Sequence, residues 1–107
     1  MKVFHLGNSK LKVLEMLPEN RIKKVQLGDQ EIAVVRVGER VSGFHVFCPH
    51  RGASLIQASL NIKGEIVCPL HQYRFDSQTG QAKSGDCADL QTYACELSES
   101  GLKIIIP

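Results

Sequence analysis

Hydrophobic and polar residues alternate in short runs along most of this chain. Residues 22–27 form one such run; residues 32–37 and 41–47 follow it, and Gly28-Asp29 and Gly38-Glu39-Arg40 lie between the three segments. A period of two is typical of half-buried strands, and glycine and Asx residues are typical of the turns between them. Residues 32–37 (Ile-Ala-Val-Val-Arg-Val) are rich in β-branched side chains, which suit a pleated surface. The pattern therefore predicts three consecutive antiparallel strands.

The rest of the chain continues this pattern with shorter runs. We expect further strands at residues 65–67, 73–75, 92–97 and 102–106. Residues 9–17 differ, because Leu11, Leu14 and either Met16 or Leu17 could share one helical face, with Ser9 as a suitable N-cap and Pro18 as a stop. The sequence thus predicts an all-β fold, a sandwich or small barrel with one short helix. We expect a single domain over residues 1–107.

Composition and charge exclude several classes of protein. The chain is 43% hydrophobic and 22% charged, which is ordinary for a folded domain. Its net charge is only +2 and no basic run occurs, so we expect no nucleic-acid partner. No apolar stretch approaches the roughly 20 residues that span a bilayer, and the amino terminus lacks the apolar region of a signal peptide. We therefore expect a cytoplasmic protein without a membrane partner.

The chain has four cysteines. In a reducing compartment, cysteines serve metal or redox chemistry more often than structural disulfides. Cys95 shares one face of a predicted strand with Tyr93 and Leu97, so we expect it to be a small core residue. Cys87 lies in the loop at 84–89, where we expect a plain loop thiol; a position beside a metal site is the alternative.

Two short motifs carry the candidate chemistry. They are Cys48-Pro49-His50-Arg51-Gly52 and Cys68-Pro69-Leu70-His71. Each places a thiol and an imidazole within one tight turn, and the proline after each cysteine stiffens that turn. One Cys-x-His is a weak signal, but its recurrence with proline both times predicts a four-ligand Cys₂His₂ site. His5 and His45 have no partner at a ligand spacing, so we interpret both as ordinary.

The identity of the metal follows from the order of the ligands. Tetrahedral Cys₂His₂ also suits zinc. Zinc fingers, however, usually keep their cysteines in one pair and their histidines in another. Mixed pairs fit a cluster of two irons, in which each loop gives one ligand to each iron.

These motifs resemble the signature of the Rieske family, which is Cys-x-His, a gap of about this length, and Cys-x-x-His. The resemblance is closest over the motifs and the turns of about 44–82, and it implies that this segment is a small cluster-binding β subdomain. It further implies that Cys48 and Cys68 bind one iron of a [2Fe–2S] cluster and that His50 and His71 bind the other. The two histidines would then lie at the tip of the protein, nearest to a partner.

The ligand set also bears on the reduction potential. The oxidised core carries two positive charges, so two thiolates make it neutral, whereas four would leave it doubly negative and harder to reduce. Rieske centres accordingly span about −150 to +300 mV, against about −400 mV for plant-type ferredoxins.

The resemblance implies the low end of that range. In high-potential members, two extra cysteines form a disulfide, and a Ser and a Tyr donate to sulfur; the corresponding residues here are Ala53, Leu70, Tyr73 and Phe75. Phe75 cannot donate a hydrogen bond, and Tyr73 is too bulky to replace Ser simply.

The implied function is electron transfer without catalysis. A soluble Rieske-type ferredoxin would pass single electrons from a flavin-dependent reductase to a terminal oxygenase or hydroxylase. Two alternatives stay open: the small subunit of an assimilatory nitrite reductase, and a structural zinc-binding interaction module. Arg51, Leu70 and Gln72 flank the predicted ligands, where they would meet either a redox partner or solvent.

Overall fold

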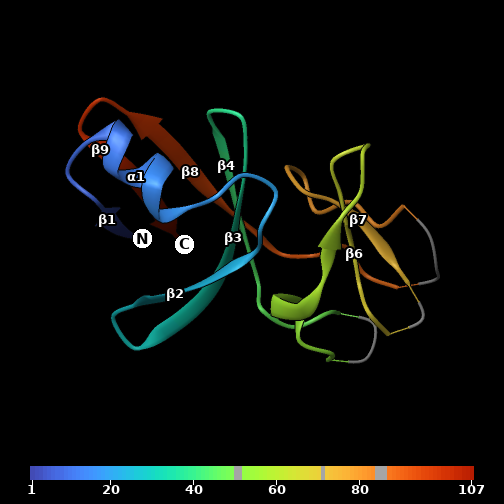
Figure 1. The fold of residues 1–107 in the computed structure, drawn as a ribbon. Helices are drawn as coiled ribbons and strands as arrows, with labels where there is room; N and C mark the ends of the chain where they lie inside the picture. Colours follow the sequence, from blue (N-terminus) through green and yellow to red (C-terminus); the bar gives the residue numbers. More distant parts are fainter. Residues whose placement is uncertain (50–51, 71, 84–86) are drawn as a thin grey trace.

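Two antiparallel sheets of different size make up the part of the protein that the structure describes (Figure 1). The computed structural model describes residues 1–49, 52–70, 72–83 and 87–107. Within them the larger sheet has six strands in the order β1-β9-β8-β4-β3-β2, and the smaller has three in the order β5-β6-β7. The strands of the larger sheet are β1 (Lys2–Leu6), β2 (Lys23–Leu27), β3 (Gln30–Val37), β4 (Arg40–Phe44), β8 (Thr92–Ser98) and β9 (Gly101–Ile106). Those of the smaller sheet are β5 (Ser59–Leu60), β6 (Glu65–Val67) and β7 (Arg74–Asp76).

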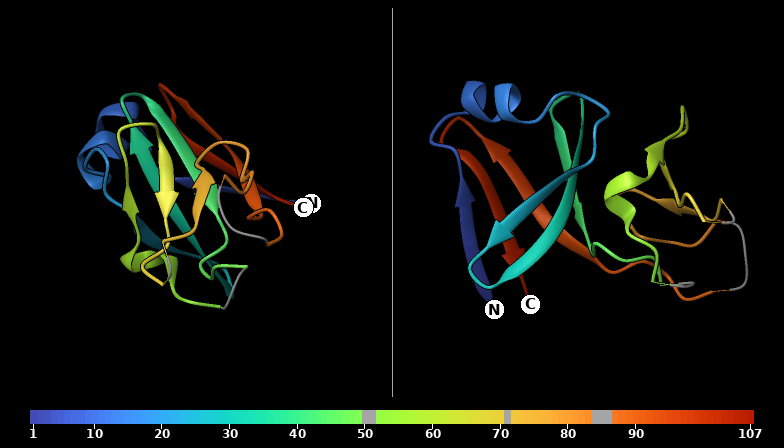
Figure 2. Two further views of the ribbon diagram at one scale, coloured as in Figure 1. Left: turned by 90° about the vertical axis from the view of Figure 1, so that its right-hand side faces the viewer. Right: turned by 60° about the horizontal axis from the view of Figure 1, so that its bottom comes forward.

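The larger sheet curls on itself. Strands β1, β9 and β8 face strands β2, β3 and β4, the helix α1 (Lys10–Met16) lies over one end, and the smaller sheet lies beside the curl (Figure 2). Lys2 of β1 pairs with Ile106 of β9, so the two termini lie side by side. The all-β prediction with one short helix is confirmed. Strands β1 and β5 were not predicted from the sequence.

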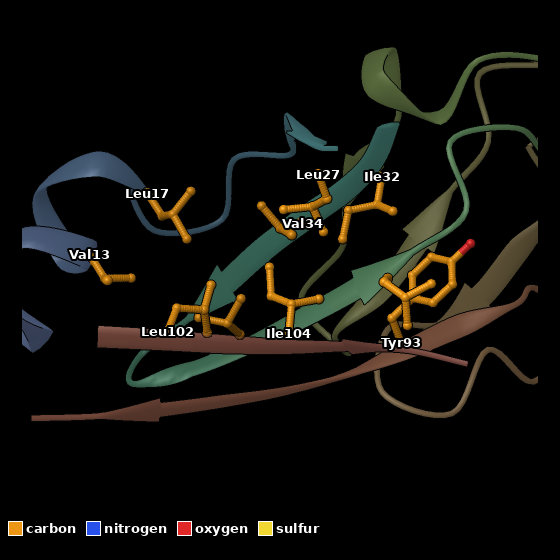
Figure 3. Packing of buried hydrophobic residues seen from close by; sticks show 10 residues of the cluster. Val13, Leu17, Leu27, Ile32, Val34, Tyr93, Leu102 and Ile104 are labelled. Atoms are coloured by element: carbon orange, nitrogen blue, oxygen red, sulfur yellow. The ribbon is translucent and has the colours of Figure 1, made fainter. Parts of the chain in front are cut away.

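Strand β3 separates two hydrophobic cores. Ile32 and Val34 face the interior of the curled sheet, whereas Ala33 and Val35 face the smaller sheet. A strand buried on both faces needs a continuous apolar run, which is what Ile-Ala-Val-Val provides. The first core, part of which is drawn in Figure 3, contains Val13, Leu17, Leu27, Ile32, Val34, Val41, Tyr93, Leu102, Ile104 and Ile106. The second core contains Ala33, Val35, Phe44, Val46, Cys48, Leu55, Ile66, Cys68, Phe75 and Leu90.

The helix α1 has the predicted ends but only part of the predicted buried face. The Ser9 hydroxyl accepts a hydrogen bond from the Lys12 backbone N–H at 3.1 Å, which is the expected N-cap. Val13 and Leu17 point into the first core, while Leu11 is 68% exposed. Of the residues expected to share one face, Leu17 is buried and Leu11 is not. Val13 lies very close to Gly7, because a Cβ on residue 7 would be only 2.9 Å from the Cγ2 atom of Val13. Packing of the helix against the first core thus selects its buried face.

Among the described residues, no helix combines the length and the apolar character that crossing a membrane requires.

The chain leaves the larger sheet after Phe44 and enters the second core. The predicted strand at 41–47 is thus shorter, because β4 ends at Phe44. The alternation nevertheless continues, with Val46 and Cys48 buried and Phe47 exposed. The Leu55 backbone N–H donates to the Val46 carbonyl at 2.7 Å and holds this segment in place. Cys48 therefore enters the second core as the continuation of a strand pattern.

The turn after β7 has the conformation that its sequence predicts. The Asp76 carboxylate accepts hydrogen bonds from the backbone N–H groups of Thr79 at 2.9 Å and Gln78 at 2.8 Å. Mainly because of the bond from Thr79, the pKa of Asp76 lies below its ordinary value. Gly80 has a φ of 79°, a left-handed conformation that glycine adopts freely. Strand β7 is thereby joined to the loop that leads back to the larger sheet.

Candidate metal centre

The two motif cysteines lie at the start of two loops with the same backbone closure. The Cys48 N–H donates to the Ala53 carbonyl at 2.8 Å, and the Cys68 N–H donates to the Tyr73 carbonyl at 2.8 Å. In both loops the acceptor follows the cysteine by the same number of residues. We call the segments 48–53 and 68–73 the cysteine loops. The repeated motif in the sequence thus corresponds to a repeated closure in the structure.

The cysteine loops also share a left-handed residue just before the acceptor. Gly52 has a φ of 73° and Gln72 a φ of 55°. Glycine adopts this conformation freely, whereas another residue loses about 1–2 kcal/mol. The Gly52 N–H in addition donates to the Cys48 carbonyl at 2.8 Å. The strained Gln72 lies in a loop whose closure depends on that conformation, and such strain is frequent at functional sites.

The cysteine loops bring their two thiols together inside the second core. Cys48 is 2% exposed and Cys68 is fully buried, and their side chains share a hydrogen bond. Burial raises the pKa of the Cys68 thiol and Cys48 adds to this effect, whereas the Leu70 backbone N–H, bonded to the same sulfur, opposes it. Two adjacent buried thiolates require a compensating positive charge. We call this pair, together with the second-core residues packed around it, the cluster pocket.

The composition of the cluster pocket suits iron and sulfide. Soft thiolates are the protein ligands of iron–sulfur clusters, and burial protects them from water. Both cysteines are free thiols and lie in the second core beside Leu55, Ile66 and Phe75. The residues present therefore fit the sulfur-ligated half of a Rieske cluster.

The two predicted histidine ligands, His50 and His71, lie outside the described residues, as does Arg51. Within the described parts of the chain, no three His, Cys, Asp or Glu side chains form a metal-binding group. The structure thus brings together Cys48 and Cys68, and the full ligand set stays a prediction.

Two large apolar side chains near the motif cysteines in sequence are exposed, and we call them the apolar rim. Phe47 is 49% exposed and Leu70 is 39% exposed, each in a position next to or near a motif cysteine. The His45 ring meets the Phe47 ring edge-on, with centroids 5.8 Å apart. Gln72 is exposed as well. Phe47 was not singled out from the sequence, because a strand pattern alone does not show which of its outward residues lies beside a metal site.

The residues expected to tune the potential lie where the sequence suggested. Phe75 is fully buried in the second core and carries no donor. Tyr73 is half-buried against the same core, and its backbone carbonyl closes the second cysteine loop. Ala53 likewise packs on this core. No thiol is available at positions 53 and 70 for a disulfide between the cysteine loops.

The remaining cysteines and histidines divide between the two cores and the surface. Cys95 packs against the first core, and burial raises its pKa to about 11, as expected for a small core residue. Cys87 packs against the second core and interacts electrostatically with Cys68, which favours the alternative position beside the metal site. No spacing rule indicates this placement. His5 lies on β1 opposite Lys103 of β9, and His45 lies edge-on against Phe47.

Comparison with known proteins identifies the family. The model of the Rieske [2Fe-2S] domain matches residues 9–94, so this chain belongs to the Rieske [2Fe-2S] domain family. The cofactor of the domain is a Rieske [2Fe–2S] cluster, which confirms the expected cofactor. The alternative of a structural zinc module is accordingly not supported.

Relatives define the class more narrowly. The chain is 33% identical over 85 residues to the ferredoxin component of the naphthalene 1,2-dioxygenase/salicylate 5-hydroxylase systems of Ralstonia sp., a match that covers 78% of this chain and 81% of that protein. Other relatives of this chain are also ferredoxin components of oxygenase systems.

Solved structures share the fold over nearly the whole chain. The ferredoxin of carbazole 1,9a-dioxygenase from Nocardioides aromaticivorans IC177 superposes with a TM-score of 0.81 at 24% identity, over 97% of both chains. The carbazole 1,9a-dioxygenase complex of reduced oxygenase and oxidised ferredoxin contains a chain that matches with a TM-score of 0.77 at 25% identity, over 95% of this chain and 91% of that one. A nitrite reductase small subunit from Mycobacterium tuberculosis, described as putative and NADH-dependent, matches with a TM-score of 0.78 at 15% identity, over 96% and 93% of the two chains, which shows the fold alone.

Proposed function

We propose that this protein is the electron-carrying ferredoxin of an oxygenase system and is not itself an enzyme. Cys48 and Cys68 hold one iron of the cluster, and His50 and His71 hold the other. The observation that carries the proposal is the pair of buried, hydrogen-bonded thiols at the start of two loops of identical closure. Each of these loops contains one of the predicted histidine ligands.

When bound, the cluster takes up and releases single electrons. The residues around the cluster determine how readily it is reduced. Burial of Cys48 and Cys68 keeps water from the sulfur ligands, and the Leu70 N–H, bonded to the Cys68 sulfur, stabilises negative charge there. Phe75 contributes no hydrogen bond. With few donors to sulfur, we expect a potential near the low end of the family, about −150 mV.

The proposed partners are a flavin-dependent reductase as donor and a terminal oxygenase or hydroxylase as acceptor. The similarity to ferredoxin components of oxygenase systems supports this assignment. The exposed Phe47 and Leu70 give the described rim an uncharged surface, and the net charge is only +2. Both properties favour a weak, transient encounter over tight electrostatic binding. We place the protein in the cytoplasm, without a nucleic-acid or membrane partner.

Spectroscopy of the purified protein tests the cofactor and its ligation. Protein prepared without oxygen should contain iron and acid-labile sulfide in equal amounts. After dithionite reduction, its EPR spectrum should show an average g below that of all-cysteine clusters. Colourless protein that contains zinc would contradict the proposal, as would protein that takes up no iron on reconstitution with ferrous salt and sulfide.

The small subunit of an assimilatory nitrite reductase is the second candidate. The similarity in fold to a putative nitrite reductase small subunit favours it, at an identity that shows the fold alone. The two candidates differ in their stable partner. Co-purification with a sirohaem protein would favour the nitrite reductase, whereas reduction by a flavoprotein and reoxidation by an oxygenase without a stable complex would favour the ferredoxin.

A further inference from the structure

The loop that contains Cys87 is anchored at both ends. The Lys83 backbone N–H donates to the Arg74 carbonyl at 2.8 Å, which ties the start of the loop to strand β7. The Ala82 N–H donates to the Asp89 carboxylate at 3.0 Å, which joins the residues that flank the loop. The described residues on either side of Cys87 are thus held to strand β7 and to each other.

The Cys87 side chain packs against the core that contains the two motif thiols. It is half-buried against the second core, to which Cys48 and Cys68 both belong. It also interacts electrostatically with Cys68, and such interactions decline with distance. Thiols from three separate segments of the chain thus belong to the second core or pack against it. Cys95 differs, because it packs against the first core on the other side of β3.

A thiol in this position can influence the cluster without binding it. Its S–H group is a weak hydrogen-bond donor with a dipole, and its sulfur fills space as a small apolar residue does. Reduction adds one negative charge to the cluster. Dipoles and donors near the sulfur atoms stabilise the reduced form and raise the potential. An apolar side chain of similar size would exclude water equally well but would supply no dipole.

We propose that the Cys87 thiol forms part of the wall of the cluster pocket and raises the reduction potential of the cluster through its S–H dipole. This inference rests on the proposed function, because it assumes the cluster between Cys48 and Cys68. Cys87 is a positioning residue and not a ligand. It would partly offset the absence of donors at Phe75.

Two substitutions separate the dipole from the volume of the side chain. Cys87→Val keeps the space filled and removes the donor, so the potential of the loaded protein should fall. The expected change is up to about tenfold in the equilibrium constant of one-electron reduction, which corresponds to about 59 mV. Cys87→Ser keeps a donor and should leave the potential unchanged or higher. Voltammetry of the loaded protein measures both, and Cys95→Ala, which removes a thiol from the first core, should leave the potential unchanged.

The outcomes distinguish this inference from the function on which it rests. Both Cys87 variants should retain the Rieske EPR signal, because no ligand is removed. If Cys87→Val has the potential of the unaltered protein, or if Val and Ser shift it equally, the thiol only fills space and the inference is wrong. Loss of the signal in both variants would overturn it too. If the unaltered protein holds no cluster, the proposed function fails together with it.

Discussion

The Leu90 backbone N–H donates to the Gly80 carbonyl at 2.8 Å, while the Leu90 carbonyl oxygen lies only 1.9 Å from the place of a Cβ on Gly80. This contact joins the turn after β7 to the segment that enters β8. It also closes the base of the loop that contains Cys87. The backbones can approach so closely only because position 80 has no side chain.

Gly80→Ala should therefore destabilise the protein far more than Gly38→Ala does. Both residues have a positive φ, but nothing lies within 4 Å of a Cβ at Gly38. In Gly38→Ala the only cost is that of a left-handed backbone for a residue with a Cβ, about 1 kcal/mol. Gly80→Ala adds a backbone clash, for which we expect on the order of 3 kcal/mol or more. Thermal unfolding of the loaded variants measures the difference, and equal midpoints would contradict the close approach.

Removal of either predicted histidine ligand should abolish the Rieske EPR signal. In His50→Ala and His71→Ala, one iron loses a nitrogen ligand, so we expect loss of the cluster or a changed spectrum. His45→Ala is the matched control, since His45 packs edge-on against Phe47 and has no predicted ligand role. EPR and iron analysis of the three variants measure the effect. A normal signal in His50→Ala would refute the ligand assignment.

A hydroxyl at position 75 should raise the reduction potential. Phe75 is fully buried in the second core, together with Cys48 and Cys68. A phenolic O–H that reaches a cysteine sulfur would stabilise the reduced cluster, because it acts on the additional negative charge. Voltammetry of Phe75→Tyr should thus give a more positive value than the unaltered protein. Phe75→Leu, which adds no donor, serves as the control, and an equal shift in both would argue against a hydrogen bond.

Cys95 should be protected from alkylation at alkaline pH. Burial raises its pKa from 9.0 to about 11, so near pH 8.5 its thiolate fraction is roughly 100-fold below that of an ordinary thiol. Mass spectrometry after iodoacetamide treatment should show slow labelling of Cys95 in the folded protein and rapid labelling in urea. Labelling at equal rates in both would contradict the burial.

The raised pKa of Cys95 makes the free energy of unfolding depend on pH. The unfolded state releases the Cys95 proton near pH 9, whereas the folded state retains it up to about pH 11. The contribution of the protonated Cys95 thiol to stability is fully present below pH 9 and is lost as the pH rises toward 11. Urea unfolding of Cys95→Ala should show a smaller loss of stability over this range than the unaltered chain shows.

Much of the fold could be predicted because its signals are local. Strand β6 lies where the alternation predicts it, and β3 lies in the continuous apolar run that a doubly buried strand requires. Ser9 caps the helix as expected. Strand β1 was missed, because its polar–apolar pattern becomes a strand only by pairing with β9 at the other end of the chain. The buried face of α1 was predicted only in part, because apolar residues lie on more than one side of the helix and packing against the core chooses between them.

The sequence by itself determined the chemistry of this protein: two Cys-Pro turns, each followed by a histidine, predicted a cluster, and the family match confirmed its kind. Spacing along the chain specifies these features because the predicted ligands of each loop lie close together in sequence. Only the tertiary structure decided which distant groups meet. The contact between the Cys48 and Cys68 thiols, the closure of Gly80 on Leu90, and the placement of Cys87 all depend on packing between remote segments. Local periodicity carries no information about such contacts.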